Sequence, residues 1–207
     1  AEGAFGQYLI CFRDFPVAIG ITAGAREYLA ADICLKYMKE AISEPCNEEQ
    51  LEAAEKALCA KLNSLSLVQP EGTFRTARKE AAKLFDRKIL FTENPRKVES
   101  VVFTKEGYRI KIEAVINGEQ KTLYASYKAW KRNNLYPDDF TKKYQSVAYA
   151  MDAEALYLSV GLINTSYKEE YSLWVNSEDK VIATWRPNVT YLPEEPDMVW
   201  KFTGTFE

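Results

Sequence analysis

Apolar residues recur at helical spacing in the first third of the chain and alternate with polar residues in the remainder. In residues 26–43 and 48–66 they fall on one face of a 3.6-residue period, which predicts two helices joined by a short turn. Asn47 followed by Gln50 is typical of a capping box at the start of the second helix. A third helix is expected from about Thr73 to Arg87, and residues 140–151 favour a short fourth helix.

Period-two alternation predicts strands over the second half of the chain. The expected strands are residues 98–105, 108–116, 121–127, 155–163, 171–175, 181–185 and 198–206. Asn117-Gly118 separates two of them and predicts a tight hairpin, because both turn positions need a positive φ.

Helices followed by a run of antiparallel strands predict an α+β fold. We expect an N-terminal helical hairpin plus a third helix packed on a curved, mainly antiparallel sheet of about six or seven strands. The sequence shows no internal repeat or long linker, so one domain over 1–207 is predicted, with a helical layer at about 15–88 and the sheet at about 89–207.

The chain of 207 residues contains no histidine. Ser-His-Asp and Cys-His nucleophile systems and imidazole zinc sites are therefore excluded. No phosphate-binding glycine motif or other recognisable catalytic motif is present, and the sequence predicts neither a cofactor nor a metal. The longest apolar stretch, around Phe15 to Ala25, is shorter than the ~20 residues of a membrane-spanning helix.

Four cysteines lie in the first third of the chain. If the two helices fold back on each other, Cys34 and Cys59 are nearly equidistant from the turn, which predicts a disulfide between them and leaves Cys11 and Cys46 as a second pair. Oxidised pairs indicate a secreted or periplasmic protein, and four reduced cysteines would instead fit a cytoplasmic one. The triplets Asn164-Thr165-Ser166 and Asn188-Val189-Thr190 also fit a secretory protein.

Charge is segregated along the chain. Residues 1–74 carry a net charge of −5, residues 75–143 of +8 and residues 144–207 of −6. In the basic block, Trp130, Lys131 and Arg132 interleave aromatic and cationic groups, which suits nucleic-acid binding as an alternative function. No RNA-recognition or zinc-finger signature accompanies them, and mutual attraction of the three blocks within one fold explains the same pattern.

Aromatic residues also gather in the last strands. Tyr157 is expected to face Tyr171 across one hairpin, and Trp174 to face Trp185 across the next. Alternation places Trp174 on the opposite face from Leu173 and Val175, so we expect it on the solvent-exposed face of the sheet.

The leading hypothesis is a non-catalytic extracytoplasmic binding domain that recognises a protein, glycan or other small ligand through this aromatic sheet face. A carboxylate-dependent hydrolase is a further alternative, because two acids at a suitable separation suffice for glycosidase-type chemistry. Asp152 and Glu154, beside an apolar strand, are the best-placed pair.

Overall fold

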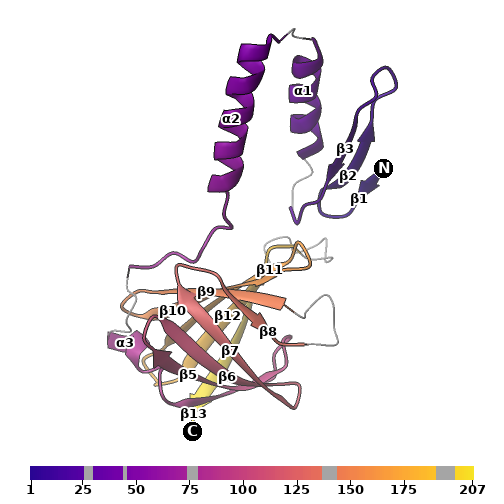
Figure 1. The fold of residues 1–207 in the computed structure, drawn as a ribbon. Coiled ribbons are helices and arrows are strands. Elements are labelled where there is room, and N and C mark those ends of the chain that lie inside the picture. Colours follow the sequence, from indigo (N-terminus) through magenta and orange to yellow (C-terminus); the bar gives the residue numbers. More distant parts are fainter. Residues whose placement is uncertain (26–29, 44–45, 74–78, 137–143, 190–198) are drawn as a thin grey trace. The chain divides into compact units, whose positions relative to one another are not determined.

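The computed structural model describes residues 1–25, 30–43, 46–73, 79–136, 144–189 and 199–207 (Figure 1). The chain divides into two compact units, residues 1–68 and 69–207.

The first unit holds a small antiparallel sheet and two helices. The sheet consists of β1 (Glu2–Gly3), β2 (Gln7–Cys11) and β3 (Ala18–Ile21), in that order. The helices are α1 (Ala30–Ser43) and α2 (Glu48–Ser64), and residues 26–29 of the first predicted helix lie outside the described residues. The capping box is confirmed, because Asn47 Oδ1 accepts from Gln50 N at 2.8 Å and Gln50 Oε1 accepts from Asn47 N at 3.1 Å.

The predicted disulfides are not formed. Cys34 and Cys59 are free thiols, as are Cys11 and Cys46, and three of the four are exposed while Cys34 is half-buried. Equal spacing from a turn brings two cysteines to the same height along a hairpin but does not turn their Cβ atoms toward each other. The cysteines of this structure therefore do not support the prediction of a secreted or periplasmic location.

The second unit contains one short helix and ten strands among the described residues. The helix α3 spans Lys79–Ala82, and residues 74–78 of the expected third helix lie outside the described residues. The strands are β4 (Lys88–Phe91), β5 (Val98–Glu106), β6 (Arg109–Ile116), β7 (Glu119–Tyr127), β8 (Lys131–Asn134), β9 (Tyr144–Met151), β10 (Ala155–Leu162), β11 (Lys168–Val175), β12 (Val181–Pro187) and β13 (Trp200–Phe206).

These strands close into a barrel, which corrects the prediction of an open curved sheet of six or seven strands (Figure 1). In the described part of the chain, β9 pairs with β10, the ladder continues through β11, β12, β13, β4, β5, β6 and β7, and β7 returns to β9. The closing pair is parallel and joins Ser126 to Ala148 and Tyr127 to Tyr149. The sequence prediction missed β4 and β8, and it took β9 for a helix. Without β4 and β9 the ring of strands is not closed.

The seam between β7 and β9 is completed by β8. β8 pairs antiparallel with β9, and the side chain of Asn133 reaches across to the backbone of β7. Its Oδ1 accepts from Tyr124 N at 2.8 Å, and its Nδ2 donates to Tyr124 O at 3.0 Å. Asn133 therefore supplies the donor and acceptor that a neighbouring strand would offer at this position.

The hairpin predicted from Asn117-Gly118 is confirmed. Both residues have positive φ, 51° and 77°, and the turn connects the paired residues Ile116 and Glu119 of β6 and β7. The period-two pattern of the barrel strands then turns one face of each strand inward, where its apolar side chains form a single core.

The two ends of the barrel differ in their filling. At the turn end, which carries the 107–108, 152–154 and 176–180 connections, the core is solid and includes the fully buried Leu84, Ile110 and Met151. Lys105 Nζ also donates a hydrogen bond to the hydroxyl of the buried Tyr149 inside this end. The opposite end, called here the loop end, carries the 92–97, 117–118 and 163–167 connections.

Candidate functional site

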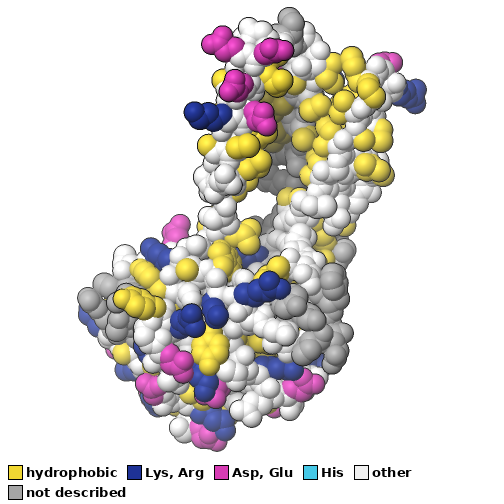
Figure 2. Space-filling view, viewed as in Figure 1, with side chains coloured by type: hydrophobic (Ala, Val, Ile, Leu, Met, Phe, Trp, Pro, Cys, Tyr) yellow, Lys and Arg dark blue, Asp and Glu magenta, His cyan; other side chains and the backbone are white. Residues whose placement is uncertain are grey.

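A cavity of about 120 Å³ lies inside the barrel, toward the loop end. Its wall comes from inward-facing positions of nearly every barrel strand and is mainly aliphatic and aromatic. The apolar residues of the wall are Phe91, Val98, Val101, Phe103, Ile112, Ala114, Ile116, Leu123, Leu135, Val147, Leu158, Val160, Leu173, Ala183 and Phe202. The outer surface of the same unit is instead dotted with lysine, arginine and acidic side chains (Figure 2).

The cavity is small. Small-molecule sites span roughly 300–1,000 Å³ and are concave and mainly apolar, with a few fixed polar groups. At about 120 Å³ the cavity shares the apolar wall and the few polar groups of such sites but lies below their usual volume.

One ion pair is built into the cavity wall. The guanidinium of Arg96, from the β4–β5 loop, lies with Nη2 3.0 Å from Oε1 of Glu169 on β11. The Glu169 side chain is only 9% exposed, and the Arg96 side chain is 35% exposed. A buried carboxylate is tolerated when it is paired and hydrogen-bonded, which is the state of Glu169 here.

Tyr171 joins both members of the pair. Its hydroxyl donates to Glu169 Oε2 at 2.7 Å and accepts from Arg96 Nε at 3.4 Å. Burial and the neighbouring Glu169 carboxylate raise the pKa of the Tyr171 hydroxyl well above its usual value, so the hydroxyl remains a donor. Burial alone would lower the pKa of Arg96, but Tyr171 and Glu169 outweigh it and the pKa is raised. Arg96 is thus held charged beside Glu169, with Tyr171 protonated between the two side chains.

Aromatic side chains pack around this ion pair. Arg96 Cζ lies 5.5 Å from the ring centroid of Trp185, and Trp185 packs against Trp200 with ring centroids 4.4 Å apart. Among the described residues, the indole Nε1 of Trp185 is buried without a hydrogen-bond partner. Tyr136 and Gln145 add neutral polar groups to the cavity wall.

Neither predicted aromatic pair forms, because the register differs by one residue in the first hairpin and by three in the second. Tyr157 is paired with Ser172 rather than with Tyr171, and Trp174 is paired with Ile182 rather than with Trp185. Because the side-chain period of a strand is two, a shift by an odd number of residues places a side chain on the other face.

The predicted aromatic set is therefore split between the two faces. Tyr171 and Trp185 are paired with each other and pack on the core. Trp174 lies on the opposite face from Leu173 and Val175, as predicted. These two neighbours are buried inside, whereas Trp174 is half-buried on the outer face, with Lys201 Nζ 5.9 Å from its ring. Whether Trp174 contacts a ligand stays a prediction.

Asp152 of the hydrolase alternative has a structural role in the β9–β10 turn. Asp152 Oδ1 accepts from the backbone N–H of Glu154 and of Ala155, at 2.8 and 2.7 Å. Asp152 Oδ2 accepts from the Tyr157 hydroxyl at 2.6 Å. Burial of the phenol and, after it, this bond raise the pKa of Tyr157 to about 12. Asp152 is thus a turn residue whose two oxygens are engaged.

Trp130, Lys131 and Arg132 lie at the barrel seam and are not among the residues that line the cavity. Lys131 and Arg132 belong to β8 and are paired with Val147 and Ser146 of β9, and Trp130 directly precedes the strand. Much of the predicted basic block, residues 74–78 and 137–143, lies outside the described residues. Nucleic-acid binding stays a prediction.

Sequence reasoning missed Arg96 and Glu169 as site residues. The sequence did carry a signal for Glu169, since alternation places it on the same inward face of the strand as Leu173 and Val175. Arg96 had none, because it lies in a loop among other polar residues and its partner is distant in the sequence.

Among the described residues, no helix has the length and hydropathy of a membrane span, and no group of acidic and cysteine side chains is arranged to hold a metal ion.

Comparisons with known proteins find solved structures of partly similar fold and assign the chain to no family. No family model matches the sequence, and no curated protein matches it. Lipid binding protein 8 of Caenorhabditis elegans is similar in structure, with a TM-score of 0.47 and 7% identity over 63% of this chain and 100% of that chain. The fatty-acid-binding protein of Manduca sexta has a TM-score of 0.43 and 10% identity over 59% of this chain and 98% of that chain. Both TM-scores lie below 0.5, so neither likeness decides what this chain binds.

Proposed function

We propose that residues 69–207 form a binding domain that takes a small, mainly apolar molecule into the interior of the barrel. The observation that carries this proposal is the cavity itself: a closed ring of strands solid at one end and hollow toward the other, with an apolar wall. Each methylene group transferred from water into such a wall contributes about 0.8 kcal/mol. The interior, rather than the aromatic outer face, is the proposed ligand surface.

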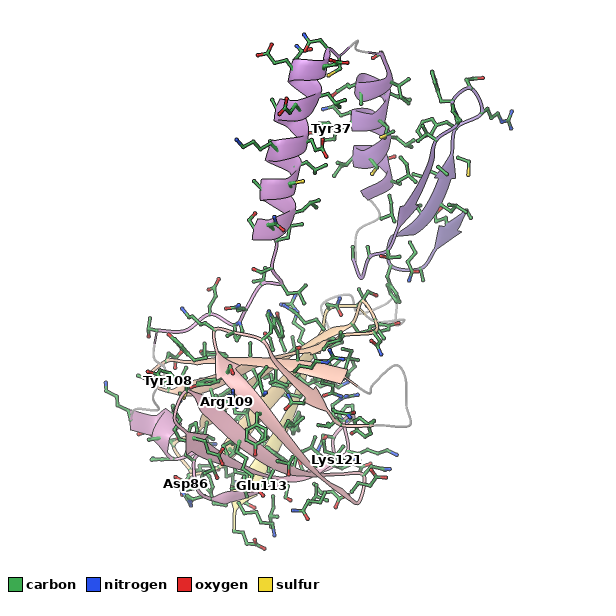
Figure 3. The ribbon with its side chains drawn as sticks, viewed as in Figure 1. Tyr37, Asp86, Tyr108, Arg109, Glu113 and Lys121 are labelled. Atoms are coloured by element: carbon green, nitrogen blue, oxygen red, sulfur yellow. The ribbon has the colours of Figure 1, made fainter. Side chains whose placement is uncertain are left out.

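The proposal is tested with a neutral fluorescent probe, N-phenyl-1-naphthylamine, titrated against the full chain. We expect saturable binding with enhanced emission, and at least about tenfold weaker binding by Ala114→Phe, because the added ring occupies the cavity that Ala114 lines. The matched control is Glu113→Phe, one residue away on β6 and on the opposite face of that strand (Figure 3).

A second pair of variants covers the case in which Ala114→Phe fails to fold. Ala183→Leu on β12 enlarges another cavity-lining side chain more modestly, and Thr184→Leu is its outward-facing control. Absence of probe binding by the unaltered chain, or equal binding by inner and outer variants, would overturn the proposal.

A secreted or periplasmic location stays a prediction. Of the two sequons, Asn188 uses its side chain structurally: Oδ1 accepts from Lys168 N at 2.8 Å and Nδ2 donates to Ser166 O at 2.9 Å. A glycan on Asn188 would replace one of the two Nδ2 hydrogens at this link and leave Oδ1 unchanged. Asn164 lies half-buried in the turn between β10 and β11. Glycan mapping of the protein from its native source would test this location by showing whether Asn164 or Asn188 carries a glycan.

A further inference from the structure

The charge balance of the cavity wall restricts the chemistry of a ligand. Among the described residues that line the cavity, Arg96 and Glu169 are the only charged side chains, and they face each other at 3.0 Å. Their charges cancel, so the cavity presents an ion pair of zero net charge rather than an isolated cation. The remaining polar groups of the described wall, Tyr136, Gln145 and Tyr171, are neutral.

The pair already uses two of the five N–H donors of Arg96 and both oxygens of Glu169. Nη2 is directed to one oxygen of Glu169, Nε donates to the Tyr171 hydroxyl, and Tyr171 in turn donates to the other oxygen of Glu169. Both carboxylate oxygens and two guanidinium nitrogens are therefore used within the protein. A ligand carboxylate that approached Arg96 would meet the Glu169 carboxylate at close range.

A second carboxylate would carry a large penalty at this site. Like charges brought together in a desolvated interface cost several kcal/mol, and an ionised group taken from water needs a counter-charge of its own. A cationic ligand would likewise add an unbalanced charge to a neutral cavity. A neutral hydrogen-bonding group carries neither penalty, because it can exchange bonds with the polar wall groups without adding charge.

From this charge balance we propose that the ligand is a neutral lipid-like molecule: an apolar body ending in an alcohol, ester or amide, and not a free carboxylic acid. This inference rests on the proposed function and adds the class of ligand. Glu169 is the positioning and selectivity residue, because its carboxylate neutralises Arg96 before any ligand arrives.

The test compares two ligands of equal chain length, decanol and decanoate, by displacement of N-phenyl-1-naphthylamine at pH 8. We expect decanol to bind the unaltered chain more tightly than decanoate. In Glu169→Gln the amide still accepts from Tyr171 but no longer neutralises Arg96. The affinity ratio of decanoate to decanol should therefore rise at least about tenfold.

Two further variants separate selectivity from folding and from intrinsic differences between the ligands. Combining Arg96→Gln with Glu169→Gln removes both charges, so the ratio should fall back toward that of the unaltered chain. Glu113→Gln removes the same charge from an ion pair on the outer face, where Glu113 lies 3.0 Å from Lys111, and should leave the ratio unchanged.

The possible failures are distinguishable. If the unaltered chain binds decanoate more tightly than decanol, or if Glu169→Gln leaves the ratio unchanged, the ligand class is wrong and the barrel remains a binding domain. Probe binding without displacement by either ligand also overturns the lipid-like class. If the probe itself does not bind, the proposed function fails and the ligand class fails with it.

Discussion

The barrel seam at Asn133 provides a sharp test of the fold. The side chain of Asn133 is almost fully buried and makes three hydrogen bonds of 2.8 to 3.0 Å, to the N–H and C=O of Tyr124 and to the C=O of Lys131. A fourth contact, to Gln145 O, is 3.4 Å long and is weaker. At ~1 kcal/mol for each short bond, Asn133→Ala should lower the free energy of unfolding by about 3 kcal/mol. The penalty includes the Tyr124 N–H, which loses this acceptor.

The measurement is urea unfolding of the full chain followed by tryptophan fluorescence. All four tryptophans, at positions 130, 174, 185 and 200, belong to the barrel unit, so the signal reports that unit alone. The control is Asn134→Ala, the exposed neighbour on β8, which should change stability by less than ~0.5 kcal/mol.

Asn133→Asp sharpens the test, because it keeps the acceptor for Tyr124 N but loses the donors to three carbonyl oxygens. We expect it to destabilise the barrel at neutral pH at least as much as Asn133→Ala does. A loss below ~0.5 kcal/mol in Asn133→Ala would refute the assignment of Asn133 as the link across the seam.

Two more predictions follow from the barrel wall and its turns. A methyl group added at Gly204 would lie 2.8 Å from Ile89 Cγ2, so Gly204→Ala should destabilise the barrel by ~1–3 kcal/mol in the same urea assay; an unchanged midpoint would contradict the packing. Since the pKa of Tyr157 is raised from 10.0 to about 12, its bond to Asp152 stabilises the fold below pH 10, and this contribution is lost as the pH rises toward 12. The stability difference between the unaltered chain and Tyr157→Phe should therefore shrink over that window, and a constant difference would exclude the bond as its source.

Local signals in the sequence predicted the elements of the barrel better than their closure. Seven expected strands correspond to β5, β6, β7, β10, β11, β12 and β13, because each carries a period-two pattern or a clear turn. β9 was misread because Val147, Ala148, Ala150 and Met151 are all buried, so the strand shows a continuous apolar run in place of alternation. Such a run does not distinguish a strand buried on both faces from a helix segment.

The two missing ring strands account for the prediction of an open sheet in place of a closed barrel. A sheet of six or seven strands is expected to be open, with two free edges and one face covered by helices. Adding β4 between β13 and β5, and β9 between β7 and β10, removes both edges. The inner face then encloses itself, and the apolar residues that had been assigned to a sheet–helix interface become the lining of a cavity.

Of the two charged residues of the site, Glu169 could be predicted from the sequence and Arg96 could not. The strand of Glu169 places Tyr171, Leu173 and Val175 on the inner face, and the same parity puts a carboxylate among them. A carboxylate at an inward position is costly unless a cation meets it, so the pattern implies a buried partner. Nothing local identifies that partner as Arg96, because only the closure of the barrel brings the β4–β5 loop to β11. The ligand preference depends on this pairing: an unpaired Arg96 would favour an acid, and the paired one favours a neutral molecule.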